Sequence, residues 1–583
     1  MLVRKAVVGL AVMSLYACGG GGSSPDGAEA DPLQPGGLPS GTTSPPALQA
    51  APGATSSNMS NMMDGGMMGG GTVTGSHIRN PPTDPTTPTP PGASPVTPPT
   101  TSPGTSPGAS PGTPPTTSPG TPPATQPPGT LAALQRLPVL DDADGNPNDG
   151  VATYNLIAED NVAVSVDTPI GPWTTPMMRY NGLQLPPVIK AKRGTTVTVN
   201  VQNNLPEDTT VHWHGFKIPG DQDGGPDTPI APGALTTYRF LINQPGASLW
   251  FHPHAEGTTA TQVYRGLAGA FVVTDDITDS LEANKQLPVG DYDIPLMIQD
   301  RSFGADNGSG VRPLVYGGMM AGMSGMLGDY LLINGAIQPA LNVETRQYRF
   351  RLYNGSNARV YDFALSNGAN FNVIGTDGGL LPAPVVTDHV RLAPGERAEI
   401  VVDFRGAGVN DTLALVNRAT NNLVAVQFNV TNAVTDDVTL YTSLPANAEV
   451  YQRLTANDAN NTRDFVMNTV GMMRFAINSK LFDPNRIDEQ VTAGTTEIWA
   501  ISNTTGMAHP FHAHAIQWQI LDINGVPASG IDLGWKDTVL VLPGQTVRFI
   551  GRFDPVVNTG LYYYHCHILE HEEAGMMGNF QIQ

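Results

Sequence analysis

The sequence predicts an all-β protein built from β-sandwich domains. Short runs of β-branched and aromatic residues, bounded by turn residues, recur through about the last 450 positions, for example near Thr195, Tyr348 and Thr546. Long apolar patterns with the helical period of 3.6 residues are scarce in the same region. Because one sandwich needs far fewer residues, this region is long enough for several such domains.

The N-terminus has the features of an export signal, which we place at residues 1–17. Arg4 and Lys5 precede an apolar stretch that is too short to span a bilayer as a permanent helix. The stretch ends in Leu15-Tyr16-Ala17-Cys18, which resembles a bacterial lipobox, although Tyr16 is bulkier than usual there. We therefore expect an exported lipoprotein, anchored to a membrane at Cys18 and facing the periplasm or the cell surface. An ordinary cleaved signal is the alternative.

Residues 18–130 contain the predicted lipidated cysteine and a low-complexity stalk rich in Pro, Gly, Ser and Thr. Such a composition cannot bury enough apolar surface to offset the entropy of ordering, so we expect a disordered tether. A methionine cluster, Met59 to Met68, lies inside the stalk with His77 nearby. Thioethers are soft ligands that select Cu(I). Copper capture and simple low-complexity drift both explain this cluster.

Charge and cysteine content restrict the partners and the redox chemistry. The formal net charge of −21 argues against a nucleic-acid partner and is compatible with cationic substrates, although plain solubility explains it equally well. Only two cysteines occur, Cys18 and Cys566. A free thiol in an oxidising compartment is prone to oxidation, so we expect Cys566 to be a metal ligand.

The histidines are concentrated in four short motifs. Ten of the twelve lie in these motifs, while His77 and His389 stand apart. The motifs are His212-Trp213-His214, His252-Pro253-His254, His509-Pro510-Phe511-His512-Ala513-His514, and the run from His565 to His571. Histidines two positions apart in an extended segment point to the same face. We expect Pro510 to interrupt the strand, so that His509 can face elsewhere.

The last motif combines a soft thiolate with imidazoles and a thioether. Two histidines, one cysteine and a weak axial methionine are the ligands of blue copper. If the motif is a strand, Cys566 faces one metal, while His565 and His567 face another. A zinc site is the alternative, but zinc sites are normally four-coordinate and have no use for an axial methionine such as Met576.

Taken in order, the motifs HWHG, HPH, HPFHAH and HCHILEHEEAGMM resemble the signature of the multicopper oxidases, the family of laccases and cuprous oxidases. The resemblance covers roughly residues 135–583. It implies three cupredoxin-like Greek-key β-sandwich domains, which we place at 131–277, 278–435 and 436–583. The ligand motifs then fall in the first and third domains, with a metal site between them and the middle domain as a spacer.

The resemblance also implies four coppers per chain: one type 1, one type 2 and a type 3 pair. It assigns His509, Cys566, His571 and axial Met576 to type 1 copper. It assigns His212 and His512 to type 2 copper. The type 3 ligands are His214, His252, His254, His514, His565 and His567.

The implied activity couples four one-electron oxidations to the reduction of dioxygen to water. This reaction consumes protons, and the resemblance points to Asp223 and Glu572 as proton donors, although Asp223 could be a turn residue and Glu572 a surface charge. Small reductants are the expected substrates: phenols, aromatic amines or Cu(I). Further methionines that could guide Cu(I), or act as flexible core fillers, are Met319, Met320, Met323, Met326, Met467, Met472, Met473 and Met507.

Other functions compete with this interpretation. A copper-sequestering protein, in which oxidation is secondary, would use the methionine clusters for binding. A nitrite reductase needs no type 3 pair, and a copper-free structural relative would not need the complete ligand set. We therefore expect an enzyme, acting as a monomer.

Overall fold

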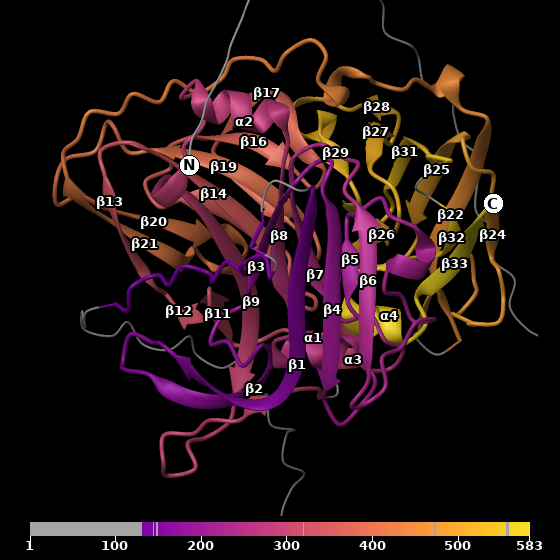
Figure 1. The fold of residues 1–583 in the computed structure, drawn as a ribbon, viewed down its shortest axis with the longest axis horizontal. Helices are drawn as coiled ribbons and strands as arrows, with labels where there is room; N and C mark the ends of the chain where they lie inside the picture. Colours follow the sequence, from indigo (N-terminus) through magenta and orange to yellow (C-terminus); the bar gives the residue numbers. More distant parts are fainter. Residues whose placement is uncertain (1–130, 144, 147–149, 319, 472–473, 556–558) are drawn as a thin grey trace, which may run out of the picture. The chain divides into compact units, whose positions relative to one another are not determined.

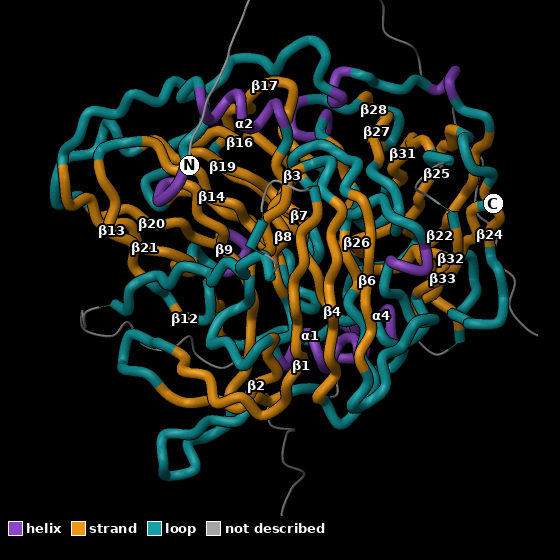
Figure 2. Tube along the Cα trace, in the orientation of Figure 1, coloured by secondary structure: helices purple, strands orange, loops and turns teal. Residues whose placement is uncertain are grey.

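The computed structural model describes residues 131–583, apart from 144, 147–149, 319, 472–473 and 556–558 (Figure 1). The predicted signal peptide, Cys18, the stalk with its methionine cluster and His77 lie outside the described residues, as do Met319, Met472 and Met473. Strands dominate the described chain and helices are few and short (Figure 2), so the all-β prediction is confirmed. Within the described residues, no helix has the length and apolar character needed to cross a membrane.

The strands form three successive pairs of sheets, each pair enclosing its own hydrophobic core. These are three cupredoxin-like sandwiches. The runs predicted near Thr195, Tyr348 and Thr546 are central strands of the three pairs. The residue limits that we placed between the domains stay predictions.

The first pair of sheets supplies two of the histidine motifs. One sheet runs β2 (Trp173–Tyr180), β1 (Val151–Val166), β4 (Thr196–Asn204) and β6 (Leu235–Leu241). The other runs β3 (Val188–Lys192), β8 (Gly269–Thr274), β7 (Ala247–His252) and β5 (His212–His214). Helix α1 (Thr259–Arg265) lies between β7 and β8, and helix α2 (Asp276–Ala283) follows β8. Residues alternate between buried and half-exposed along β4, as expected where one sheet face packs on the core.

The second pair of sheets contains none of the predicted metal ligands. One sheet runs β12 (Ala336–Ile337), β11 (Tyr330–Ile333), β9 (Asp293–Phe303), β14 (Gln347–Asn354), β19 (Arg397–Asp403), β16 (Phe371–Thr376) and β17 (Gly379–Thr387), with β10 (Leu314–Val315) beside β9. The other runs β13 (Ala340–Glu344), β21 (Leu423–Asn432), β20 (Thr412–Asn417), β15 (Tyr361–Leu365) and β18 (His389–Leu392). The short helix α3 (Ala321–Ser324) precedes β11.

The third pair of sheets supplies the other two motifs. One sheet runs β23 (Arg474–Ile477), β22 (Asn461–Val470), β25 (Thr496–Asn503), β31 (Thr546–Arg552), β27 (Trp518–Ile523) and β28 (Val526–Pro527), with β29 (Trp535–Lys536) beside β27. The other runs β24 (Glu489–Val491), β33 (Met577–Ile582), β32 (Gly560–Cys566), β26 (His509–Ala513) and β30 (Thr538–Val541). Helix α4 (Leu569–Glu573) links β32 to β33.

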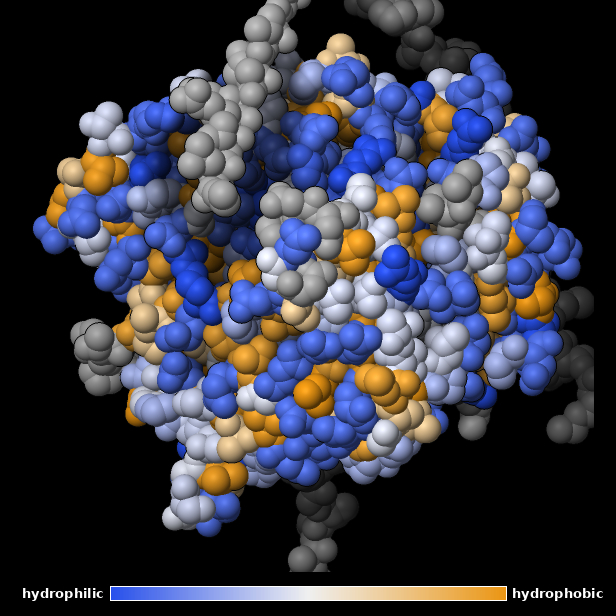
Figure 3. Space-filling model, viewed as in Figure 1, coloured by the Kyte–Doolittle hydropathy of each residue, from blue (hydrophilic) through white to orange (hydrophobic). Residues whose placement is uncertain are grey.

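Hydrogen bonds join the sandwiches directly. Tyr562 of the third domain donates to the Ile218 carbonyl of the first at 2.8 Å. Arg351 of the second domain donates to the Ser248 hydroxyl of the first at 3.0 Å. The motif-bearing strands β5 and β26 lie near one another in Figure 1. On the face drawn in Figure 3, hydrophilic and hydrophobic side chains are interspersed.

Candidate metal centres

Strand pairing places the histidine motifs opposite one another in register. In the first domain β5 runs antiparallel to β7, with His212 opposite His252. In the third domain β26 runs antiparallel to β32, with His512 opposite His565. Cross-strand partners have closely spaced side chains on the same face. Two pairs of motifs that are far apart in sequence are therefore brought together by backbone pairing alone.

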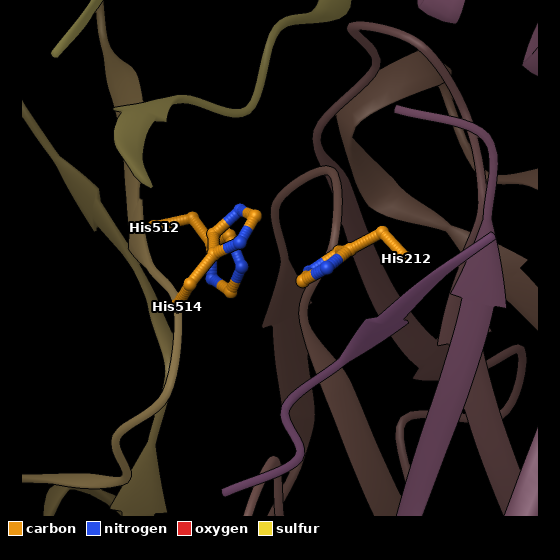
Figure 4. Close-up of side chains that lie close together, drawn as sticks. All are labelled: His212, His512 and His514. Atoms are coloured by element: carbon orange, nitrogen blue, oxygen red, sulfur yellow. The ribbon is translucent and has the colours of Figure 1, made fainter. Parts of the chain in front are cut away.

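Histidine rings from the first and third domains stack on one another. The ring of His514 stacks on that of His212, with centroids 3.9 Å apart, and His512 stacks on His214 at 3.8 Å. Figure 4 shows His512 and His514 extending from one strand toward His212. All of these rings are buried. We call the resulting cluster the eight-histidine site; its members are His212, His214, His252, His254, His512, His514, His565 and His567.

One group of nitrogens within this site converges on His565. Its Nε2 lies 3.2 Å from the Nε2 of His254 and 3.3 Å from the Nε2 of His514. Carboxylates face the outer nitrogens: Glu572 Oε2 is 3.0 Å from His565 Nδ1, and Asp223 Oδ2 is 2.6 Å from His514 Nδ1. A carboxylate that accepts the Nδ1 proton leaves Nε2 as the ligand atom. These three nitrogens could therefore hold one metal ion.

A second group contains His214, His252 and His567. The His252 Nε2 lies 3.4 Å from the His214 Nδ1. The outer nitrogen of His214 faces Asp537, whose Oδ1 is 3.0 Å away. Among the described residues neither ring nitrogen of His567 has a hydrogen-bond partner, although both are buried. Such orphaned nitrogens fit a metal ion, since a buried polar group left unpaired costs about 1–3 kcal/mol.

His212 and His512 are oriented by the backbone. The Nδ1 of His212 donates to the Asp223 carbonyl at 3.0 Å, and the Nδ1 of His512 donates to the Asp537 carbonyl at 2.9 Å. The Nε2 of each ring is buried and has no partner among the described residues. Both rings thus present a free nitrogen inside the site, as a pair of copper ligands would.

A second site surrounds the single described cysteine. The Cys566 Sγ lies 3.4 Å from the His509 Nδ1 and 3.7 Å from the His571 Nδ1. The buried Met576 belongs to the same core, and its carbonyl accepts from the Cys566 amide at 3.0 Å. We call these four residues the cysteine site. Two imidazoles and a thiolate lie together here, and the thioether of Met576 would complete a donor set suited to blue copper.

Burial keeps both imidazoles of the cysteine site neutral, which is the form that binds a metal. It lowers the pKa of His509 to about 3 and that of His571 to about 4, so both rings are neutral near pH 7. Burial raises the pKa of the Cys566 thiol above its usual range. The thiol therefore gives up its proton only in exchange for a metal ion. The outer Nε2 of His509 bonds to the Thr505 hydroxyl at 2.9 Å.

The sequence comparisons agree with this geometry. Models of multicopper oxidase domains match residues 161–277, 296–436 and 443–583. The chain is 37% identical over 408 residues to the multicopper oxidase mco of Staphylococcus aureus, which covers 69% of this chain and 83% of that protein.

The chain belongs to the multicopper oxidase family.

Other multicopper oxidases support the same assignment. The chain is 33% identical over 477 residues to a laccase of Bacillus subtilis, covering 70% of this chain and 90% of the laccase. Its fold matches the crystal structure of a laccase from Pediococcus acidilactici with a TM-score of 0.70 and 34% identity, covering 79% of this chain and 95% of that one. The protein is thus an oxidoreductase of a copper-dependent family.

One prediction about this oxidase was wrong. Pro510 does not interrupt the strand, because β26 begins at His509 and pairs with β30 through Pro510 opposite Leu540. His509 nevertheless faces away from the eight-histidine site. It lies three positions before His512, and an odd spacing in a strand places two side chains on opposite faces. The same rule separates Cys566 from His565 at the end of β32.

The two predicted proton donors are both buried beside the eight-histidine site. Burial raises the pKa of Asp223 well above its usual range. Burial also favours a raised pKa for Glu572, but the neighbouring His254 and His565 outweigh it and lower that pKa to about 2. A pocket of about 180 Å³ is bordered by His254 and Glu572. Glu572 is therefore not the surface charge of the alternative interpretation, whereas Asp223 does end a turn, Gly220–Gln222, while its side chain is buried.

Sequence reasoning missed two residues of this multicopper oxidase. Asp537 contacts His214, and its carboxylate pairs with Arg397 of the middle domain at 2.6 Å. Asp537 lies outside the four histidine motifs, in the stretch Gly534–Thr538. Nothing in the sequence distinguishes Arg397 from other strand arginines. The spacer predicted between the motif-bearing domains therefore also reaches the site.

Proposed function

We propose that this multicopper oxidase holds one type 1 copper at the cysteine site, and one type 2 copper and a type 3 pair at the eight-histidine site. The observation that carries the proposal is the adjacency of Cys566 to His565 and His567, which places two metal-binding donor sets on one short peptide. Copper would supply one-electron transfer at the first site and dioxygen reduction at the second. The chain then couples four oxidations of a small reductant to the formation of water.

The ligand assignment follows the orientation of each ring. His509, Cys566 and His571 hold type 1 copper, with Met576 as the axial ligand. His212 and His512 hold type 2 copper through their unpartnered Nε2 atoms. The type 3 pair is held by His214, His252 and His567, and by His254, His514 and His565.

The surrounding residues keep the dioxygen chemistry contained and supply protons. The ligand rings are buried, which limits the escape of partly reduced oxygen. The Asp223 carboxylate contacts His514, and the Glu572 carboxylate contacts His565 and borders the 180 Å³ pocket. Asp223, whose pKa burial raises, is placed to donate a proton to the site. Glu572 is ionised near pH 7, so it would relay protons that it takes up from the pocket, which is also a route for dioxygen and water.

The outer edge of the cysteine site faces a methionine-rich segment. The Nε2 of His571 donates to the Met323 carbonyl of α3 at 3.2 Å. Met326, two residues beyond α3, is buried, whereas Met320 is 59% exposed. Thioethers select Cu(I), and the net charge of −21 favours cations. These features support Cu(I) as a substrate beside phenols and aromatic amines.

Metal analysis tests the core of the proposal. Copper-loaded protein should be blue, with copper at both sites, and Cys566→Ser should remove the blue colour and the activity together. A colourless protein that takes up zinc in preference to copper would refute it. Oxygen uptake measured side by side with Cu(I), Mn(II), Fe(II) and a phenol then identifies the substrate class. No oxygen uptake with Cu(I) would contradict its assignment as a substrate.

We also propose that the enzyme is exported and anchored through a lipid on Cys18, and that it acts as a monomer. Support for the anchor comes from the charged and apolar pattern of residues 1–17.

A further inference from the structure

Arg397 lies where the three domains meet. It begins β19 of the middle domain, which contributes none of the proposed copper ligands, and its side chain is buried. All five of its N–H groups have acceptors. Nε donates to the Ser248 carbonyl at 2.9 Å, Nη1 to the Gly395 carbonyl at 2.9 Å and Asp537 Oδ1 at 2.7 Å, and Nη2 to the Asp377 carbonyl at 3.0 Å and Asp537 Oδ2 at 2.6 Å. A guanidinium satisfied in this way is fixed in position.

Asp537 connects the fixed guanidinium of Arg397 to two proposed ligands. Its side-chain Oδ1 is 3.0 Å from the His214 Nε2, and its carbonyl accepts from the His512 Nδ1 at 2.9 Å. With a carboxylate at Nε2, His214 keeps its proton there and presents Nδ1 to a metal. One residue therefore sets the ring orientation of a first-domain ligand and of a third-domain ligand.

The backbone is packed tightly around the ion pair between Arg397 and Asp537. A Cβ added at Gly215 would lie 2.6 Å from Asp537 Oδ2 and 2.7 Å from Arg397 Nη2. A Cβ added at Gly395 would lie 2.8 Å from the Cδ2 of His567. Side chains are excluded at both positions, which lets the middle domain approach the eight-histidine site closely.

We infer that Arg397 is a positioning residue for the eight-histidine site, acting through Asp537 on His214 and His512. The middle domain is then required for copper retention, although it supplies no ligand. This inference rests on the proposed function, because it assumes that the eight-histidine site binds copper. Arg397 itself touches none of the proposed ligands with a hydrogen bond, so its effect is indirect.

Arg397→Lys tests the inference, with Arg351→Lys as the matched control. Lysine keeps the charge but cannot make the two parallel bonds to a carboxylate. Arg351 is also buried in the middle domain and also bonds to Ser248, but it pairs with Asp293 and Glu399 rather than with Asp537. Total copper per chain, blue absorption per chain and copper transfer to a chelator are measured on the full-length loaded proteins.

Arg397→Lys should retain the blue absorption but lose copper from the eight-histidine site, with roughly 10–100-fold weaker retention against the chelator. Arg351→Lys should retain both the blue absorption and the copper of the eight-histidine site. Wild-type copper retention in Arg397→Lys would overturn the inference, and so would equal losses in the two variants, since these indicate general domain loosening. If Arg397→Lys does not fold, the same measurements of copper retention and blue absorption on Asp537→Asn test the inference. A wild-type protein that is not blue would instead refute the proposed function.

Discussion

Asp223 and His514 face one another across the boundary between the first and third domains, with 2.6 Å between Asp223 Oδ2 and His514 Nδ1. The Asp223 carbonyl also accepts from the His212 Nδ1. Asp537 repeats the arrangement from the other side, with its carboxylate on His214 and its carbonyl on His512. Two aspartates thus orient four proposed ligands by the same pair of contacts.

Asp223→Asn should slow the reoxidation of the reduced enzyme by dioxygen, and leave the reduction of type 1 copper near the wild-type rate. Asparagine keeps the size of the side chain but cannot release a proton. Proton transfer by a placed side chain is typically worth about 10²–10⁴-fold, so the loss should be large. Stopped-flow absorption of the blue band measures both half-reactions.

Asp221→Asn is the matched control for this variant, because Asp221 lies in the same loop but is exposed. It should behave like the wild type. If Asp223→Asn slows both half-reactions equally, or lowers copper content, its contacts to His514 and His212 matter more than its proton, and Glu572 becomes the first candidate for proton supply.

Met576→Leu should raise the reduction potential of type 1 copper while the blue band persists. A weak axial thioether stabilises Cu(II) slightly, so its removal favours Cu(I). Redox titration of the blue absorption measures the change. Met577→Leu is the control, since Met577 begins β33 opposite His565. A raised potential in Met577→Leu and an unchanged potential in Met576→Leu would make Met577 the axial ligand instead.

Gly215→Ala should destabilise the protein by more than Gly194→Ala. Both glycines have positive φ, +88° and +93°, where an L side chain costs roughly 1–2 kcal/mol. Only Gly215 also faces a clash, with Asp537 Oδ2 and Arg397 Nη2, whereas a Cβ at Gly194 meets nothing within 4 Å. Denaturant unfolding of both variants measures the difference, and equal losses would show that the ion pair shifts freely.

The copper-free protein should lose stability as the pH falls from about 6.5 to about 4. Burial lowers the pKa of His254 and of His571 to about 4, from an ordinary value of 6.5. Each ring is neutral when folded and takes up a proton on unfolding in this window, so the unfolded state gains stability as the pH falls. The effect is about 1.4 kcal/mol per pH unit for each proton.

Denaturant unfolding of the copper-free protein at a series of pH values measures this slope. His254→Gln should reduce it by about one proton, or roughly 1.4 kcal/mol per pH unit. A stability that stays constant across the window would mean that these rings are not held neutral by burial.

Cys18→Ala should convert a membrane-associated protein into a soluble or unprocessed one. The apolar segment before Cys18 is too short to remain as a membrane anchor, so attachment depends on the lipid. Cell fractionation with detection of the enzyme measures the change. Wild-type protein found wholly in the soluble fraction would rule out the lipid anchor.

Much of the site was predictable because its chemistry is local. The ligand types follow from the four motifs, and the separation of Cys566 from His565 follows from the two-residue period of a strand. The orientation of His509 also follows from that period, and not from a break at Pro510, through which β26 continues. The all-β fold follows in the same way from short strand-like runs.

The donor atoms, the fold class and the family follow from the residues and their spacing alone. Only the three-dimensional packing decides which nitrogen of each ring is free, because that depends on hydrogen-bond partners hundreds of positions away, such as Asp537 for His214 and Asp223 for His514. It also decided the place of Arg397, since an ion pair between domains leaves no periodic pattern in the chain. Local spacing sets which face a side chain occupies, whereas long-range packing sets what that side chain meets there.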